Sequence, residues 1–217
     1  MDHDMADALA PPSRRRALRL TAAGILTAGA VPLTAHRATA RSDDVCTGGY
    51  DAEFERDLAE ADARVAPEDD RALFPEALAP RGRYTLPLRR DFRVSARYGI
   101  RGDWLAGHHT GIDLAVPRGT PVYAVGAGVV VLARRSGAYG NAVTVRMRDG
   151  HYAVYAHLSA IRVQQGDAIG AGTRVGSSGA TGRATGPHLH LEIRVRRGYG
   201  SDIDPVRYLA ERGARLL

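Results

Sequence analysis

From about residue 84 onward, short hydrophobic runs that favour β-structure are separated by glycine. These runs cover residues 112–116, 121–132, 141–147 and 151–158. Asp149-Gly150 stands between the last two runs, where it predicts a tight hairpin turn. Many short strands at this spacing predict an all-β fold, either a sandwich or a barrel.

Ahead of this region, hydrophobic positions over residues 50–65 recur with the period of an amphipathic helix. They are Tyr50, Phe54, Leu58, Ala61 and Val65, and the opposite face carries charges. Repeated prolines then interrupt the chain. We therefore expect residues 41–83 to form a short helical preface and linker, mainly a spacer, before a single domain over 84–217. Near the end of that domain, Asp204-Pro205 predicts the start of a terminal helix.

A second pattern is the alternation over residues 188–193. His188 and His190 fall on one face of the predicted strand, and the intervening leucines fall on the other. Side chains two apart lie roughly 7 Å apart along a strand, so the two imidazoles project side by side. Glu192 continues the histidine face, either as a partner of an imidazole or as a surface carboxylate. Taken alone, the pair is equally consistent with polar residues on the solvent face of a half-buried strand.

The amino terminus has the order of a signal peptide rather than of a folded segment. Ser13 and three arginines are followed by a modestly apolar stretch over 20–35, and then by the small-x-small sequence 38–40. The paired arginines resemble a twin-arginine export signal. We expect residues 1–40 to be removed on export, leaving no membrane span and an extracytoplasmic, wall-associated protein. The alternative is an uncleaved anchor, but the stretch is shorter than the roughly 20 apolar residues that a spanning helix needs.

Composition adds two constraints. The formal net charge is +6, and every basic residue is arginine. Removing residues 1–40 takes away five arginines and three aspartates and leaves +4. The charges of both signs are dispersed without a basic stripe, which disfavours nucleic-acid binding. Cys46 is the only cysteine, so no intrachain disulfide can form, and the residues before it make a poor lipoprotein site.

Further polar residues stand at the ends of predicted strands. His109 and Asp113 flank the start of one run, and His157 ends another, on the face expected to carry Ala153 and Tyr155. A hydrolytic zinc site needs about three protein ligands and an open position, with a base and an oxyanion donor nearby. One aspartate and four histidines, from three strands, supply that inventory. Other polar residues read as bystanders or turn residues, although Tyr98 could also line a groove: they are His108, His151, Asn141 and Tyr98.

Three ordered motifs carry a family resemblance. They are His109-x-Gly111-x-Asp113, Tyr155-Ala156-His157-Leu158-Ser159 and Gly186-Pro187-His188-Leu189-His190. Together they resemble the lysostaphin/LytM-type zinc peptidases over roughly residues 95–208. The resemblance implies a compact β-sandwich with a zinc-containing groove and one Zn²⁺ per chain, held by His109, Asp113 and His190. It also implies that His157 and His188 act as the general base for the attacking water and as the stabiliser of the tetrahedral intermediate. Which histidine has which role is left open. The implied substrate is a peptide bond of peptidoglycan stems or cross-bridges.

Two other functions compete with this one. A non-catalytic domain of the same fold could bind the wall or activate a partner amidase, but this chain keeps every expected ligand and both candidate catalytic histidines. An unrelated zinc hydrolase is disfavoured because the chain has no His-Glu-x-x-His motif. Some relatives of the resembled family are held latent by a residue before the domain, such as an asparagine, that occupies the open position of the metal. Asn141, inside the domain, is the only asparagine here, so that device is absent, although Cys46 or a carboxylate could substitute. The bond that is cut is left open, and we expect the loops 101–108 and 134–141 to decide it.

Overall fold

The computed structural model describes residues 51–65, 84–102 and 104–217. The predicted signal peptide, Cys46 and residues 66–83 of the predicted linker lie outside the described residues. Within the described part of the chain, none of the helices is long and apolar enough to span a membrane.

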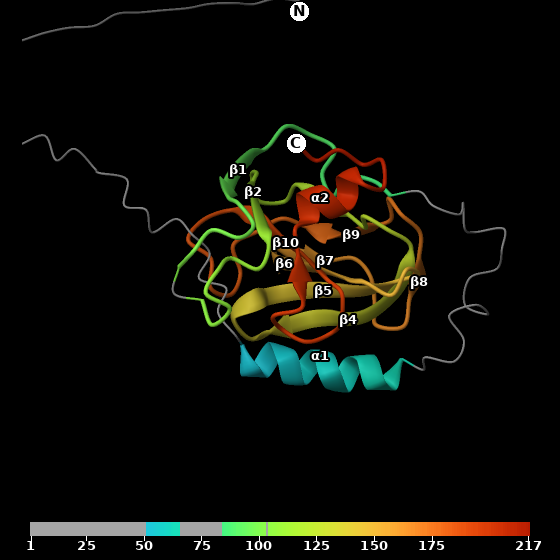
Figure 1. Cartoon of the computed structure of the whole chain (residues 1–217). Coiled ribbons are helices and arrows are strands. Elements are labelled where there is room, and N and C mark those ends of the chain that lie inside the picture. The colour runs from blue at the N-terminus through green and yellow to red at the C-terminus, as the bar shows by residue number, and fades with distance from the viewer. Residues whose placement is uncertain (1–50, 66–83, 103) are drawn as a thin grey trace, which may run out of the picture. The chain divides into compact units, whose positions relative to one another are not determined.

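A large antiparallel sheet forms the centre of the fold (Figure 1). Its strands, in spatial order, are β1 (Arg93–Ala96), β2 (Ile112–Ala115), β10 (His188–Arg194), β6 (Tyr152–Leu158), β5 (Gly140–Met147), β4 (Gly128–Ser136) and β8 (Ala168–Ile169), and β11 (Asp202–Ile203) pairs with β10. The alternation over 188–193 is therefore a central strand, flanked by β2 and β6. Both of its faces are buried, because a second layer covers each side of the sheet.

A smaller sheet covers one face. It contains β3 (Pro121–Tyr123), β9 (Arg174–Ser177) and β7 (Ala160–Ile161). Val122 and Val175 from this sheet share a hydrophobic core with Leu189, Leu191 and other residues of the large sheet. The short helix α2 (Pro205–Ala210), whose N-cap Asp204 accepts hydrogen bonds from Val206 and Arg207, also adds to this core. The predicted β-sandwich is thus confirmed.

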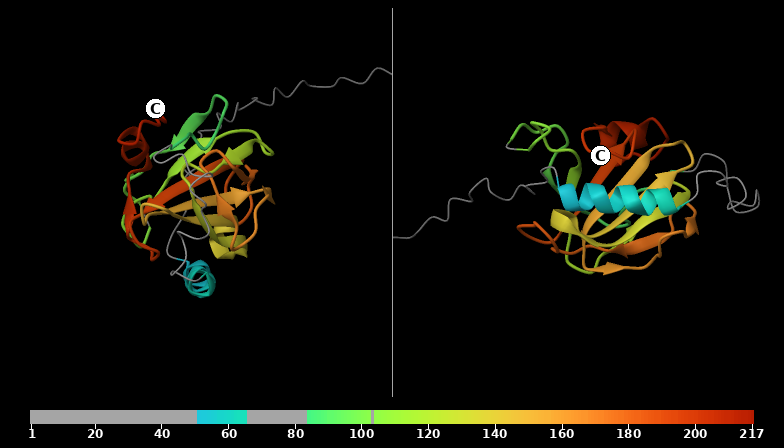
Figure 2. Two further views of the ribbon diagram at one scale, coloured as in Figure 1. Left: turned by 90° about the vertical axis from the view of Figure 1, so that its right-hand side faces the viewer. Right: turned by 90° about the horizontal axis from the view of Figure 1, so that it is seen from below.

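Helix α1 (Ala52–Arg64) covers the opposite face of the large sheet (Figure 2). It begins after Asp51, whose carboxylate accepts a hydrogen bond from the Phe54 amide at 2.8 Å and so caps the helix. The residues of the predicted apolar face that lie within the helix, Phe54, Leu58 and Ala61, are buried against valines and alanines of β4 and β6. The predicted helical segment before the sheet is confirmed, and it packs mainly on β4 and also contacts β6, the strand that ends near His157.

Candidate functional site

Three candidate metal ligands converge where β2 and β10 pair. His190 on β10 lies directly opposite Asp113 on β2, and His109 precedes β2. The Nδ1 atom of His190 is 2.7 Å from Oδ1 of Asp113 and 3.2 Å from Nε2 of His109. All three residues are buried, and their candidate ligand atoms lie within 4.8 Å of one another.

Gly111, between His109 and Asp113, allows this close approach. A Cβ atom at position 111 would lie 2.6 Å from the carbonyl oxygen of Leu191 and 2.7 Å from Cε1 of His190. Any larger residue would push the strands apart or displace the imidazole. The glycine of the first motif therefore has a packing role in the site.

The donor set fits a zinc ion, because zinc binds imidazole nitrogen and carboxylate oxygen in such groups of three. In each histidine of the set, the ring nitrogen that faces away from the other ligands already makes a hydrogen bond. Nδ1 of His109 lies 3.0 Å from the carbonyl of Arg97, and Nε2 of His190 lies 3.0 Å from Oε1 of Glu192. Because these partners accept hydrogen bonds, each imidazole keeps its other nitrogen for the shared centre. The buried Nε2 of His188, 3.8 Å from Asp113, has no hydrogen-bond partner among the described residues. An additional group at this centre would satisfy it.

His157 and His188 stand beside the ligand set with their ring centroids 4.8 Å apart. The Nδ1 atom of His157 is 2.8 Å from the carbonyl of Thr181, and that of His188 is 2.8 Å from the carbonyl of Gly186. Both carbonyls belong to the glycine-rich loop before β10. Each Nδ1–H therefore donates to the backbone, which leaves Nε2 of each ring as the acceptor.

The position of His157 differs from the alternation-based expectation. Ala153 and Tyr155 face the core between the sheets, whereas the His157 ring contacts His188 and His190 on the other face. The cause is a bulge in β6. Val143 pairs with Tyr155 and Asn141 pairs with Leu158, so a three-residue advance along β6 matches a two-residue advance along β5. His157 has a φ of 58° there, a left-handed conformation that costs on the order of 1–3 kcal/mol for a non-glycine residue.

Burial controls the charge of these two histidines. It lowers the pKa of His157 to about 3, and the neighbouring His190 and His188 add to the effect. Burial also lowers the pKa of His188, against the opposing charge of Asp113. Both imidazoles are therefore neutral near pH 7, which is the form that can accept a proton.

The ligand set has the opposite electrostatics. Burial disfavours the Asp113 carboxylate, but its close contacts with His109 and His190 outweigh burial and hold the pKa of Asp113 well below its usual range. Burial likewise disfavours a cationic His190, yet hydrogen bonds with Asp113 and Glu192 raise its pKa to about 10. In the metal-free protein a proton thus lies between His190 and Asp113, and a metal must displace it.

Glu192, which the sequence left open between two interpretations, is fully buried behind His190. Its Oε1 atom accepts hydrogen bonds from Thr110 at 2.6 Å and Tyr139 at 2.9 Å, besides contacting His190. Its Oε2 atom accepts one from Nε of Arg194 at 2.7 Å. Sequence reasoning missed Thr110, Tyr139 and Arg194. Alternation could have placed Arg194 on the face of His190 and Glu192, but no local signal marks Tyr139.

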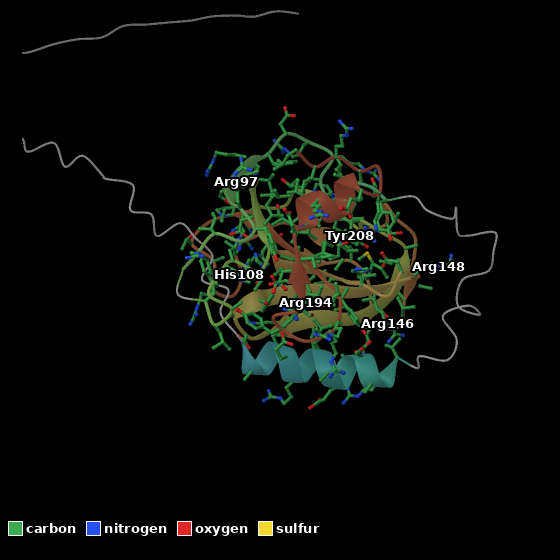
Figure 3. All side chains as sticks on the ribbon, in the orientation of Figure 1. Arg97, His108, Arg146, Arg148, Arg194 and Tyr208 are labelled. Carbon is green, nitrogen blue, oxygen red and sulfur yellow. The ribbon has the colours of Figure 1, made fainter. Side chains whose placement is uncertain are left out.

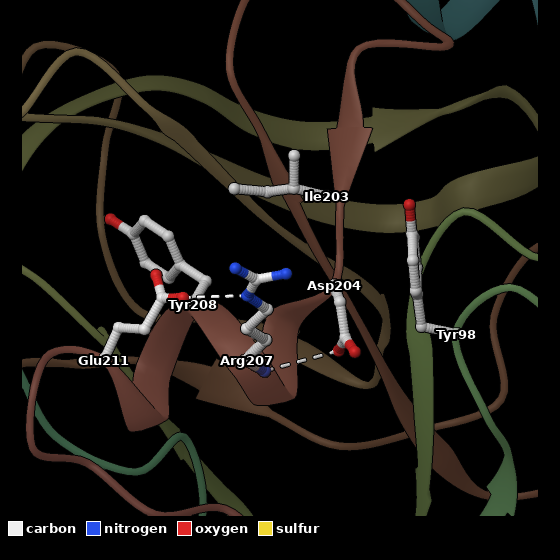
Figure 4. A pocket seen from close by; sticks show the side chains of 6 residues that line it. All are labelled: Tyr98, Ile203, Asp204, Arg207, Tyr208 and Glu211. Carbon is white, nitrogen blue, oxygen red and sulfur yellow. Dashed lines mark hydrogen bonds and ion pairs between the residues drawn. The ribbon is translucent and has the colours of Figure 1, made fainter.

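The other polar residues noted in the sequence lie outside this cluster. His108 pairs with Asp202 at 2.8 Å, and His151 lies 3.2 Å from Asp149 at the hairpin turn. Asn141 donates to the carbonyl of Leu158 at the bulge. Tyr98 lines a pocket of about 320 Å³ beside α2 (Figure 4). Among the described residues, that lining includes none of the five proposed site residues.

Comparison with known proteins gives a consistent result. A family model described as peptidase family M23 matches residues 107–205. The chain is 50% identical over 119 residues to the DD-carboxypeptidase/endopeptidase Mpg of Neisseria meningitidis serogroup B, covering 52% of this chain and 26% of the relative. It is 49% identical over 88 residues to the peptidoglycan DD-endopeptidase ShyA of Vibrio cholerae, covering 41% and 20%. The chain thus spans about a quarter and a fifth, respectively, of the length of these two relatives.

Solved structures include similar domains. The catalytic domain of the antimicrobial peptidase lysostaphin from Staphylococcus simulans aligns with a TM-score of 0.52 and 35% identity, covering 55% of this chain and 92% of that one. A zinc-containing peptidase from Vibrio cholerae aligns with a TM-score of 0.51 and 29% identity, covering 58% and 44%.

Proposed function

The chain belongs to peptidase family M23, and we propose that it is an exported zinc endopeptidase that hydrolyses peptide bonds of bacterial peptidoglycan. The observation that carries this proposal is the meeting of His109, Asp113 and His190 beside two neutral histidines. Relatives named as peptidoglycan DD-endopeptidases support the substrate class.

We assign the metal to Nε2 of His109, the carboxylate of Asp113 and Nδ1 of His190, with one Zn²⁺ per chain. When bound, zinc supplies Lewis-acid activation of water and of the scissile carbonyl. The chain's own contribution is to hold the two imidazoles and the carboxylate in place through Arg97, Glu192 and the close packing at Gly111.

His157 and His188 move protons in this proposal. Each offers a neutral Nε2, so one of them accepts the proton of the attacking water. The Nε2–H formed in this way stabilises the developing oxyanion and then passes its proton to the leaving amine. Because Thr181 and Gly186 fix both rings through Nδ1, the proton transfers are confined to Nε2.

Export follows from the substrate, because peptidoglycan lies outside the cytoplasmic membrane. We propose that residues 1–40 are the signal and resemble the twin-arginine type. The net charge of +4 expected after cleavage suits an anionic wall surface.

The test is zinc content of the purified protein, followed by digestion of isolated peptidoglycan and mass spectrometry of the released peptide ends. We expect one zinc per chain and new peptide ends. His190→Ala should lose zinc and activity together, whereas His188→Ala and His157→Ala should keep most of the zinc and lose the activity. His151→Gln, at the hairpin turn, is the matched control and should retain both.

Two outcomes would reject the proposal. Bound zinc without new peptide ends from any wall substrate would favour the non-catalytic, wall-binding or amidase-activating alternative. Full activity of His157→Ala would remove the role that we give to that residue.

A further inference from the structure

Helix α1 lies outside the segment matched by the family model, yet it reaches a candidate metal ligand through buried charges. We propose that α1 is a positioning element of the metal site, acting from Glu55 through Arg194 and Glu192 on His190. This inference rests on the metal site of the proposed function. It gives the helix of the preface a role beyond that of a spacer.

The contacts form a continuous chain. Nε2 of His190 lies 3.0 Å from Oε1 of Glu192, and Oε2 of Glu192 lies 2.7 Å from Nε of Arg194. Nη1 of Arg194 in turn lies 2.8 Å from Oε1 of Glu55 on α1. His190, Glu192 and Arg194 alternate along β10, so all three side chains project toward the face that α1 covers.

Arg194 needs the helix because its guanidinium is fully buried. A buried cation costs several kcal/mol unless its hydrogen bonds and charge are matched. Glu192 satisfies only Nε of Arg194, while Nη1 donates to Glu55 and to the carbonyl of Arg197, and Tyr139 accepts from Nη2 at 3.0 Å. With Glu55 present, the charge of Arg194 is shared between two carboxylates. Without it, Glu192 is the one carboxylate left to balance the charge of Arg194, which weakens Glu192 as an acceptor for His190.

An aromatic contact supports the same link. Phe54 of α1 stacks on Tyr139 with ring centroids 3.9 Å apart and an interplanar angle of 16°. Tyr139 donates to Oε1 of Glu192, so the helix fixes the position of that carboxylate from two sides. Ligand histidines depend on such partners for ring orientation and basicity, and loss of a direct partner typically weakens metal binding 10–100-fold.

Glu55 also reaches the loop that carries His109. Its Oε2 atom accepts from the backbone amide of Tyr199 at 3.1 Å. The hydroxyl of Tyr199 accepts from the amide of Ala106 at 3.3 Å, three residues before His109. One carboxylate on α1 is thus connected to segments on two sides of the ligand set.

A second carboxylate of α1 supplies the control. Asp62 binds Nη1 of Arg146 at 2.7 Å and the hydroxyl of Tyr152 at 2.9 Å. In Figure 3, Arg194 and Arg146 both lie on the sheet side of α1, with Arg146 nearer its carboxyl end. The side chains of Asp62 and Glu55 are 11% and 13% exposed, so the two carboxylates are buried to a similar degree. Asp62→Asn therefore weakens helix docking without touching the chain of contacts that leads to His190.

The experiment compares full-length wild type, Glu55→Gln and Asp62→Asn. Zinc affinity is measured by competition with a chromophoric chelator, and ligand geometry by the visible spectrum of the Co²⁺-substituted proteins. We expect Glu55→Gln to bind zinc about tenfold more weakly, at the low end of the range because it acts through intermediates. Its Co²⁺ bands should shift. Asp62→Asn should match wild type in both measurements, although both variants lower the melting temperature of the metal-free protein.

Wild-type zinc affinity and Co²⁺ spectrum in Glu55→Gln would overturn the inference, and so would equal losses in the two variants. If Glu55→Gln does not fold, the milder Glu55→Asp replaces it, with a smaller loss of affinity expected and an unchanged affinity overturning the inference. A wild-type chain that binds no zinc would overturn this inference and the proposed function together. If the wild type binds zinc strongly, an unchanged affinity of Glu55→Gln overturns this inference alone and leaves the proposed function standing.

Discussion

Replacing Arg194 by methionine tests the energetics of the buried charges in the metal-free protein. The substitution keeps a long side chain but removes the cation that faces Glu192 and Glu55. Glu192 is 0% exposed, so its carboxylate remains buried with His190 as its one ion-pair partner among the described residues. Removing one member of such a pair costs about 3–5 kcal/mol. For a domain of this size, each kcal/mol lowers the melting temperature by about 2–4 °C, so we expect a fall on the order of 10 °C.

The assay is thermal unfolding followed by circular dichroism in excess chelator, so that metal binding does not contribute to stability. Arg207→Met is the control, because Arg207 pairs with Glu211 at 2.8 Å but its side chain is 80% exposed. That variant should unfold at the wild-type temperature. In Arg194→Met, adding Glu192→Gln should recover about 2 kcal/mol, since the uncompensated charge is then gone.

Two results would refute this reasoning. One is a melting temperature for Arg194→Met no lower than that of the control. The other is a double variant whose loss equals the sum of the two single losses, because additivity would mean that Glu192 and Arg194 do not stabilise each other.

Three further predictions follow from the structure. Gly111→Ala should lower zinc affinity, and it should lower the free energy of unfolding by about 1–3 kcal/mol, because the new methyl group meets Leu191 and His190. Chelator competition measures the zinc affinity, and urea titration measures the stability. Zinc loading at pH 7 should release close to one proton, from His190, detectable by calorimetry in buffers of different ionisation enthalpy. Hydrogen bonds from Tyr208 and Tyr84 lower the pKa of Asp149, although burial opposes this shift. The stabilisation that the Asp149 carboxylate gives the folded protein is therefore present above the unfolded-state pKa of about 4 and is lost below it. The melting temperature of Asp149→Asn should therefore fall below that of wild type at pH 7, by a margin that narrows on going from pH 5 to pH 3.

The sequence predicted the features that depend on local periodicity. Short runs punctuated by glycine predicted the sandwich, and the spacing of Phe54, Leu58 and Ala61 predicted the buried face of α1. The family motifs nominated His109, Asp113 and His190, which the structure brings together. The bulge at His157 was not predictable in this way, because alternation assumes one residue per step on each strand.

The contacts behind the ligands were missed for a different reason. Arg194 and Glu55 are separated by 139 residues in the sequence, and each reads locally as a surface charge. Only the docking of α1 on the sheet brings them together and buries Arg194. Long-range pairing between charged residues leaves no periodic signal, so a single sequence cannot distinguish a buried ion pair from two solvated side chains.

In each of the four histidines of the site, one ring nitrogen faces away from the shared centre and makes a hydrogen bond, and the four differ in the acceptor of that bond. His109, His157 and His188 each donate to a backbone carbonyl, whose partial charge is fixed and whose position depends on local loop structure. His190 alone among these four binds a carboxylate, and that carboxylate is shared with Arg194 and, beyond it, with α1. A carboxylate raises the basicity of a ligand more than an amide carbonyl does. Changes at α1 should therefore act mainly on metal affinity through His190, and should leave the proton-transfer roles of His157 and His188 unaltered once the site is saturated with zinc.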